Sequence, residues 1–193
     1  MESSNRALST AILGGSFDPV HRGHLAMAEA VIDAGVVDRI LFLPCHVSPH
    51  KTGTIATSEQ RLEMLRIALE DGAWSRASIS RYEIEREKPS YSWQTITAFS
   101  ESDPEVSWYW IVGTDQWNSL DRWARPDILR EKLHFIVCPR GEDELVERAD
   151  WHCTVIPFEH PASSTAIRED FEGHLDWLTP GVIDFCRKEG LYG

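Results

Sequence analysis

A glycine turn and two histidines within residues 14–25 constrain the fold of this chain more than any other feature. Before them, a short apolar run at 11–13 ends at two glycines, as a buried strand does. After them, apolar residues over 25–32 follow the i, i+3, i+7 spacing of one helix face. The histidines therefore fall where a strand passes into a helix, and α/β folds bind ligands at such points.

Strand-like and helix-like patterns alternate along the rest of the chain. A helix is predicted over 57–69, where Thr57 and Gln60 form a capping box. A last helix is predicted from an N-cap at Thr179 to a stop at Gly190. Short apolar runs that favour strands buried on both faces lie at 39–43, 108–112, 135–138 and 154–156.

This alternation predicts an α/β fold, a doubly wound (Rossmann-like), mostly parallel sheet with helices on both faces. A chain of 193 residues with 42% hydrophobic residues can bury one good core. We expect a single domain over 1–193, with a C-terminal helical segment at about 163–193 packed on it. The acidic stretch at 142–150 reads most simply as a solvated loop or helix face.

Charge and cysteine usage exclude several classes of partner. The 19 basic and 31 acidic residues give a net charge of −12, which disfavours nucleic acid and anionic membrane surfaces as partners. No apolar run is long enough to span a membrane, and the polar N-terminus lacks the apolar core of a signal peptide, so we expect a cytoplasmic protein. The four cysteines are widely spaced without a C-x-x-C pair, so we expect reduced thiols and no protein-held metal.

The first motif has the chemistry of a phosphate site. Gly14 and Gly15 allow positive φ and let a phosphate approach the backbone closely. His21 and His24 are three residues apart, and His24 falls in the first turn of the helix, where backbone N–H groups favour an anion. A lone histidine there would more often be a cap, but the pair beside a glycine turn favours function. The G-x-G-x-x-G pattern of dehydrogenases is absent.

A second motif lies at residues 163–168, where three hydroxyl residues precede a short helix that ends in Arg168. An ordinary serine N-cap explains part of it. However, neither Glu nor Gln stands three residues on to close a capping box, so the first-turn N–H groups are available to phosphate. Arg168 adds a bidentate phosphate contact that lysine cannot reproduce. Local positive charge comes from these motif residues and from Lys51.

Together the two motifs resemble the paired signatures of the nucleotidylyltransferase superfamily and, more narrowly, the bacterial nicotinate-nucleotide adenylyltransferases. The likeness runs nearly end to end. It continues through Pro49-His50-Lys51, Pro89-Ser90-Tyr91-Ser92, Gly113-x-Asp115 and Trp123. The phosphate motifs are specific to the superfamily, whereas the Pro-Ser-Tyr and Trp123 segments narrow the family.

The resemblance implies an enzyme of NAD biosynthesis that transfers AMP from ATP to nicotinate mononucleotide, giving deamido-NAD and pyrophosphate. Mg²⁺ is expected with the ATP, bound mainly through phosphates and water. The catalytic residues implied are His21, His24, Lys51 and Arg168. The ATP-binding residues implied are Gly14, Gly15, Ser16, Phe17, Gly113, Asp115, Ser163, Ser164 and Thr165. The mononucleotide-binding residues implied are Tyr91, Ser92, Trp123 and Ala124.

Other functions stay open at this point. A related enzyme could use nicotinamide mononucleotide or phosphopantetheine as acceptor, although Trp123 and the Pro-Ser-Tyr segment argue against the second. A non-catalytic nucleotide-binding module could retain the fold, although both histidines, Lys51 and Arg168 are present together. A synthetase-like ligase fragment lacks the basic face that tRNA requires. The sequence leaves homo-oligomer formation undecided.

Overall fold

The computed structural model describes residues 7–46, 53–86, 89–139 and 144–193, and its centre is one parallel sheet. In the described chain this sheet has six strands in the order β3-β2-β1-β4-β5-β6. The strands are β1 (Ser9–Gly15), β2 (Arg39–Pro44), β3 (Ala77–Ile79), β4 (Ser107–Gly113), β5 (His134–Cys138) and β6 (Cys153–Val155). All pairings are parallel, which confirms the doubly wound fold and every strand predicted from an apolar run.

The connections between strands carry the helices. They are α1 (Arg22–Asp33), α2 (Ser58–Asp71), α3 (Tyr82–Glu85), α4 (Ser92–Ser102), α5 (Thr114–Asn118), α6 (Pro126–Lys132), α7 (Ser164–Glu169) and α8 (Pro180–Glu189). Two 3-10 turns lie at Leu120–Arg122 and Glu172–Trp177. The predicted cap of α2 is confirmed, because the Thr57 hydroxyl accepts the Gln60 N–H at 3.2 Å. The predicted stop of α8 is confirmed at Gly190, whose φ is 65°.

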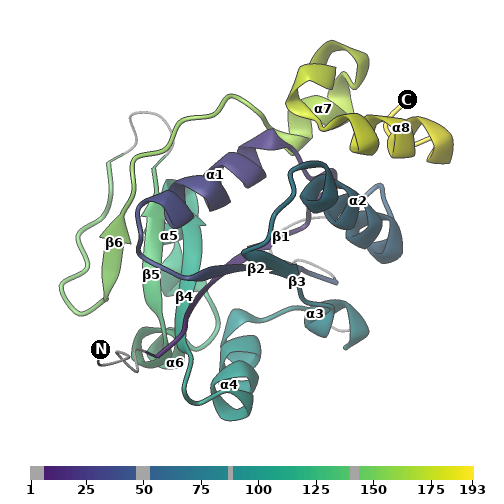
Figure 1. The fold of residues 1–193 in the computed structure, drawn as a ribbon. Helices are drawn as coiled ribbons and strands as arrows, with labels where there is room; N and C mark the ends of the chain where they lie inside the picture. Colours follow the sequence, from purple (N-terminus) through teal and green to yellow (C-terminus); the bar gives the residue numbers. More distant parts are fainter. Residues whose placement is uncertain (1–6, 47–52, 87–88, 140–143) are drawn as a thin grey trace, which may run out of the picture.

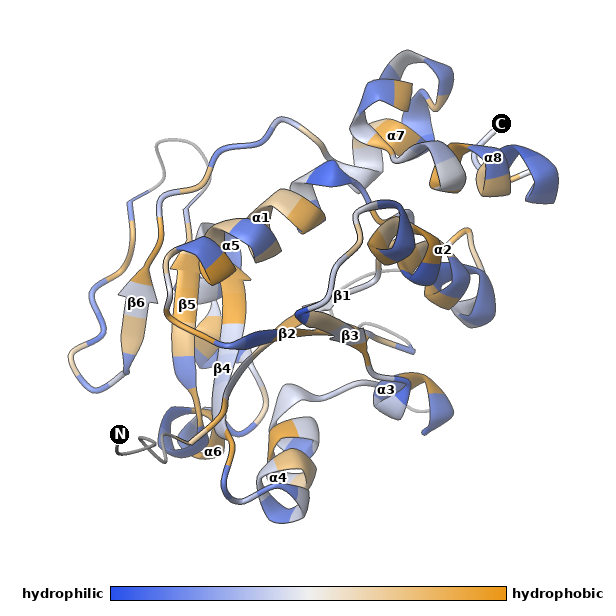
Figure 2. Ribbon diagram, viewed as in Figure 1, coloured by the Kyte–Doolittle hydropathy of each residue, from blue (hydrophilic) through white to orange (hydrophobic). Residues whose placement is uncertain are grey.

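Alternate residues of each central strand point into two different cores. In β1, Ala11 and Leu13 enter the core under α1, α2 and α8, whereas Ile12 enters the core under α4, α5 and α6. Figure 1 shows these two helical layers on opposite sides of the sheet, and Figure 2 shows the mainly hydrophobic strands β4 and β5 between them. Both faces are covered, which explains the continuous apolar runs of the strands.

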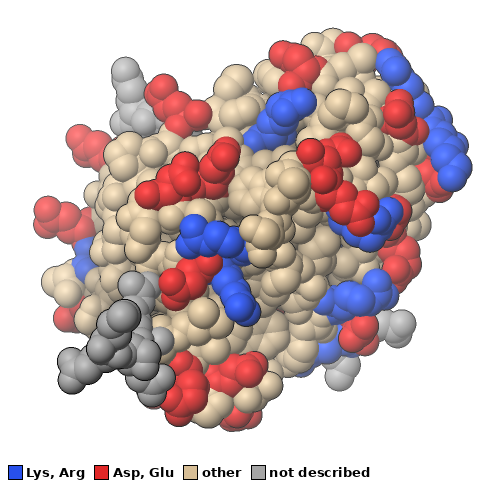
Figure 3. All heavy atoms as spheres, in the orientation of Figure 1, with Lys and Arg blue, Asp and Glu red and all other residues tan. Residues whose placement is uncertain are grey.

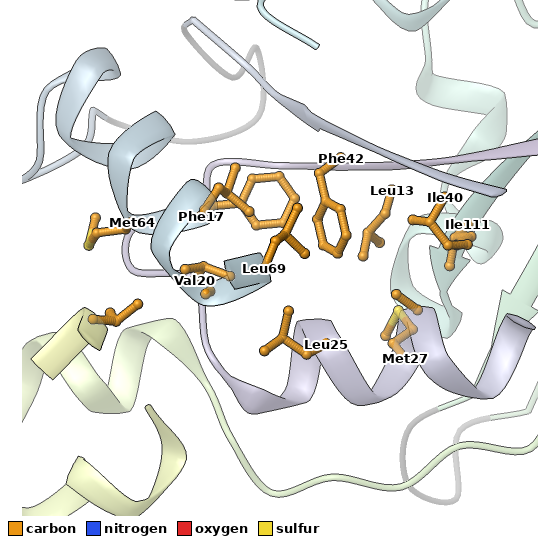
Figure 4. Packing of buried hydrophobic residues seen from close by; sticks show 14 of the residues in the cluster. Leu13, Phe17, Val20, Leu25, Met27, Ile40, Phe42, Met64, Leu69 and Ile111 are labelled. Atoms are coloured by element: carbon orange, nitrogen blue, oxygen red, sulfur yellow. The ribbon is translucent and has the colours of Figure 1, made fainter. Parts of the chain in front are cut away.

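The core on the α1 side lies directly beneath the first motif. Figure 4 shows Phe42 and Leu13 from the strands packed above Leu25 and Met27 of α1. Phe17, which follows β1, is part of the same cluster and is 2% exposed. The loop after β1 is therefore anchored by an apolar side chain, which fixes the position of the backbone on either side of it.

The strand order reverses between β1 and β4. Strands on one side run β1, β2, β3 outward, and strands on the other run β4, β5, β6. At such a switch point the loops that leave the carboxyl ends diverge and leave room for a ligand. Gly15 ends β1 and Gly113 ends β4, so the first motif and the Gly113-x-Asp115 segment meet at this place.

The acidic stretch is a loop in its described part, as expected, but it is fastened to α5. The Asn118 side chain donates to the Glu144 carbonyl and accepts the Val146 N–H. Arg148, whose side chain is 7% exposed, pairs with Asp121 at 2.7 Å. The segment is thus held in place by specific bonds.

Surface charge is mixed on the face that Figure 3 shows, where acidic and basic side chains alternate without a broad basic area. All four cysteines are free thiols, and Cys153 is the exposed one. No helix in the described ranges is long and apolar enough to cross a membrane.

Candidate active site

The two glycines of the first motif are strand residues, and neither uses the positive φ that glycine allows. Gly14 and Gly15 belong to β1, and the positive φ of this loop, 51°, is at Phe17. The space around both glycines is tight. A Cβ on Gly14 would lie 3.2 Å from the ring of Trp110, and one on Gly15 would lie 3.2 Å from the ring of Phe17.

The two histidines form a stacked pair at the start of α1. His21 is the N-cap, and the ring centroids of His21 and His24 are 3.8 Å apart. The His21 backbone N–H donates to Nδ1 of His24 at 3.3 Å. A neutral ring that accepts at Nδ1 carries its proton on Nε2. His21 is 3% exposed, whereas His24 lines the cavity described below, so His24 is the member that can donate to a ligand.

The second motif docks onto the loop of the first. Ser163 is the N-cap of α7, and its side chain makes no capping bond. The Ser164 hydroxyl donates to the Pro19 carbonyl at 3.0 Å, and Nη1 of Arg168 donates to the Asp18 carbonyl at 2.8 Å. These bonds join segments about 150 residues apart in the sequence and hold the guanidinium beside the loop after β1.

A cavity of about 200 Å³ lies between these motifs at the switch point. Nine of the predicted site residues line it, namely Gly14, Gly15, Ser16, Phe17, His24, Gly113, Asp115, Ser164 and Arg168. Thr165 is exposed and accepts from Nη2 of Arg168. Lys51 lies outside the described residues. The cavity presents hydroxyl, imidazole and guanidinium groups, which are donors suited to phosphate oxygens.

Asp18 organises the loop and was not singled out in the sequence. It is 3% exposed and accepts the N–H groups of Ile55 and Ala56 at 2.8 and 3.0 Å. The Tyr192 hydroxyl donates to the same carboxylate at 2.6 Å, and burial together with this bond raises the pKa of Tyr192. Asp18 therefore joins the loop after β1 to residues 55–56 and to Tyr192. The only signal for this role in the sequence was that Asp18 lies within the first motif.

Arg61 is a second structural residue that the sequence did not single out. Its side chain in α2 is completely buried and donates to the carbonyls of Ser16 and Cys45 at 2.6 and 2.8 Å. It also donates to the Ser58 hydroxyl. Arg61 thus joins the loop after β1 to the loop after β2. An arginine in a helix usually reads as solvated, so the sequence carried no signal for this role.

The residues predicted to bind the acceptor lie on two segments away from this cavity. One segment contains Trp93 and the other contains Arg125. The guanidinium carbon of Arg125 lies 5.9 Å from the centre of the Trp93 ring, so the two segments are in contact. Trp123 packs edge-on against Trp110 of β4, with centroids 6.4 Å apart. Tyr91 is 39% exposed. The predicted residues are Tyr91 and Ser92 at the start of α4, and Trp123 and Ala124 before α6.

The comparisons of this chain with a family model and with curated relatives agree on one family. A family model described as Cytidylyltransferase-like matches residues 12–170. A protein of Hydrogenobaculum sp. is 35% identical over 96% of this chain and 98% of its own length. A protein of Geobacillus thermodenitrificans is 38% identical over 94% of this chain and 85% of its own length. Both carry the name "Probable nicotinate-nucleotide adenylyltransferase".

Solved structures share the fold. The nicotinic acid mononucleotide adenylyltransferase of Plasmodium falciparum complexed with NaAD superposes with a TM-score of 0.81. It is 20% identical, and the match covers 96% of this chain and 97% of that one. The same enzyme complexed with APC gives a TM-score of 0.80 at 19% identity. At these identities the likeness establishes the arrangement of strands and helices.

Proposed function

This chain belongs to the cytidylyltransferase-like family and, within it, to the nicotinate-nucleotide adenylyltransferases, and from this premise we propose that it transfers AMP from ATP to nicotinate mononucleotide. It is a nucleotidyltransferase. The observation that carries the proposal is the convergence of His24, Ser164 and Arg168 on one cavity at the switch point of the sheet. The His24 imidazole and the Arg168 guanidinium, from two distant segments, are donors that suit a polyphosphate better than a neutral ligand.

The reaction needs positioning more than proton transfer. An oxygen of the acceptor 5′-phosphate attacks the α-phosphorus of ATP, and a new P–O bond forms. The bond from the α-phosphorus to the oxygen bridging to the β-phosphorus breaks, and pyrophosphate leaves with that electron pair. The nucleophile is already an anion at neutral pH, so no general base is required. The obstacle is repulsion between two anions, which fixed donors reduce.

Each donor has a support that fixes it before ATP binds. The His21 N–H orients the His24 ring, so that Nε2–H can donate to a phosphate oxygen. The Asp18 carbonyl and the Thr165 hydroxyl each accept one N–H of Arg168, whose remaining N–H groups can bind the β- and γ-phosphates together with the first-turn backbone N–H groups of the second motif. We assign Lys51 to the reacting phosphates, and Gly113 and Asp115 to the adenosine side.

Mg²⁺ fits the site as a partner of the ATP phosphates. Of the two carboxylates in the cavity lining, Asp18 is occupied by two N–H groups and a hydroxyl, and Asp115 is exposed. The donors around them suit phosphate oxygens. The cation would therefore be held by ATP and water, where it would offset phosphate charge.

We also place the reaction in the cytoplasm, because four free thiols suit a reducing compartment.

The acceptor is assigned to the second pair of segments. Trp123 is half-buried and offers a ring against which a pyridine can stack. Backbone N–H groups near Tyr91, Ser92 and Ala124 would bind the pyridine carboxylate. Because this recognition uses the backbone, side chains alone distinguish poorly between a carboxylate and an amide on the ring.

Pyrophosphate release tests the proposal. The purified protein would be assayed with ATP and Mg²⁺ and with each of three acceptors, namely nicotinate mononucleotide, nicotinamide mononucleotide and phosphopantetheine. We expect kcat/KM for the first to exceed that for the others by at least about tenfold, since the carboxylate gains charge-assisted hydrogen bonds. A preference for phosphopantetheine would show that the natural acceptor is not nicotinate mononucleotide. Release with none of the three, from folded protein that binds ATP, would favour the non-catalytic module.

A further inference from the structure

Glu83 is a buried carboxylate beneath the segment to which the acceptor is assigned. It lies in α3 and is 6% exposed, whereas Glu85 of the same helix is exposed and pairs with Arg81. Burial raises the pKa of Glu83. An acidic residue in such a place costs free energy unless its oxygens are hydrogen-bonded, so its partners are informative.

The partners of Glu83 flank the acceptor turn on both sides. The Thr95 hydroxyl donates to Oε1 of Glu83 at 2.7 Å, and Thr95 is 1% exposed in the first turns of α4. The Ser90 hydroxyl also bonds to the carboxylate and helps to lower its pKa against the effect of burial. Between Ser90 and Thr95 lies the N-cap of α4, Tyr91, with Ser92 after it. One carboxylate therefore holds both ends of this short turn.

The same bonds reach the end of β2. The Ser90 oxygen accepts the His46 backbone N–H at 3.2 Å, which leaves its own proton for Glu83. On the other side, Arg86 donates to the Tyr82 hydroxyl at 2.8 Å and to the Gln94 side chain at 3.1 Å. Glu83 is thus the buried centre of a network that joins α3, α4 and the loop after β2.

We propose that Glu83 is a positioning residue for the acceptor, because its carboxylate fixes the turn at Tyr91 and Ser92 whose backbone N–H groups receive the mononucleotide. The inference rests on the proposed function. Tyr91 is 39% exposed, whereas Glu83 and Thr95 beneath the turn are 6% and 1% exposed, so the buried support of the turn comes from these two residues. A buried network with every member bonded supplies that rigidity. Without it, the N–H groups would sample several directions, and acceptor affinity would fall.

Glu83→Gln tests the proposal, because it keeps the size of the side chain and removes one acceptor oxygen. We expect KM for nicotinate mononucleotide to rise about tenfold, which is the size of one lost charge-assisted hydrogen bond. The values of kcat and of KM for ATP should stay within about twofold. Thr95→Val should reproduce the effect, and Thr95→Ser should restore wild-type KM by returning the hydroxyl. Glu85→Gln, on the same helix, is the matched control and should leave all three constants unchanged.

Other outcomes overturn the inference. An acceptor KM within twofold of wild type in folded Glu83→Gln contradicts it. So does a joint rise of both KM values with a lower melting temperature, which indicates a structural role only. If Glu83→Gln does not fold, the contrast between Thr95→Val and Thr95→Ser decides. A wild type that is inactive with this acceptor overturns the proposed function and the inference together, whereas an active wild type with unaffected variants overturns the inference alone.

Discussion

The cavity to which we assign the phosphates and the segments to which we assign the acceptor, called here the phosphate half and the acceptor half, are built in different ways. Around the cavity at the switch point, Arg61 and Asp18 are each at most 3% exposed, and their side chains are bonded to the backbone of the loops. At the acceptor segments, Tyr91 is 39% exposed and Trp123 is half-buried. The first half uses side chains fixed by buried hydrogen bonds, and the second presents backbone groups from a turn.

This difference explains which functional residues a sequence can reveal. Side chains that bind phosphate must be of particular types at particular spacings, so they leave a motif. Backbone groups leave none, and their support lies in buried residues such as Glu83 that resemble surface acids in the sequence. We therefore expect changes in the phosphate half to affect stability and kcat, and changes in the acceptor half to affect acceptor KM.

The largest expected effect is on stability and comes from Arg61→Met. The substitution fills a similar volume but leaves the carbonyls of Ser16 and Cys45 buried without their donor. The loss should be about 3 kcal/mol in the free energy of unfolding, measured by urea denaturation. Arg66→Met, exposed on the same helix, is the control and should change stability little. A loss no larger than that of the control would show that Arg61 does not hold the loops together.

The next largest effect is on catalysis and comes from His24→Ala. Removing the donor at Nε2 should lower kcat about 10²-fold, comparable to the loss of one oxyanion donor. KM for ATP should change less than threefold, since most phosphate contacts remain. His152 is exposed and lies just before β6, so His152→Ala is the control variant. Full kcat in His24→Ala would show that His24 does not stabilise the transition state.

A smaller effect is expected from Tyr192→Phe, which deletes one hydroxyl. Asp18 keeps its two N–H donors, so the loop should keep its shape while losing one hydrogen bond to a charged group. We expect a loss of about 1.5 kcal/mol, measured by thermal and urea unfolding, with kcat within about threefold. Tyr109→Phe in β4 serves as the comparison. Unchanged stability would mean that the chain terminus does not support the loop.

The smallest effect is expected in the acceptor half, from Tyr91→Ala. The backbone N–H of the turn is retained, so KM for nicotinate mononucleotide should change by less than about threefold. Trp123→Ala, which removes the proposed stacking ring, should raise the same constant about tenfold. Steady-state assays at varied acceptor concentration measure both. A tenfold rise in Tyr91→Ala would show that its side chain contacts the acceptor, and the contrast between the two halves would weaken.

The sequence predicted the parts of the fold that depend on local patterns. Buried strands appeared as apolar runs, and the cap of α2 followed from Thr57 and Gln60. The edge strand β3 was not predicted, because its three residues are half-buried or exposed and carry no apolar run. The tight space at Gly14 was not predicted, since the neighbouring Trp110 ring comes from β4 and reaches this place only in the assembled fold.

For the candidate site, the sequence could predict residues that line the cavity but not the residues that support them. Nine predicted residues line one cavity. The hydrogen bond between Asp18 and Tyr192 joins residues 174 positions apart, and no sequence pattern in either segment predicts it. Arg61 and Glu83 are charged residues on helices, where solvent exposure is the usual outcome. Their burial follows from how the loops after β1 and β2 pack, which only the assembled fold determines.

The most direct test of this account is a pyrophosphate-release assay over varied ATP and nicotinate mononucleotide for wild type, His24→Ala and Glu83→Gln. We expect His24→Ala to lower kcat about 10²-fold with little change in acceptor KM. We expect Glu83→Gln to raise acceptor KM about tenfold with kcat nearly unchanged. Equal losses of kcat in both variants, with KM unaffected, would contradict the division of the site into a phosphate half and an acceptor half.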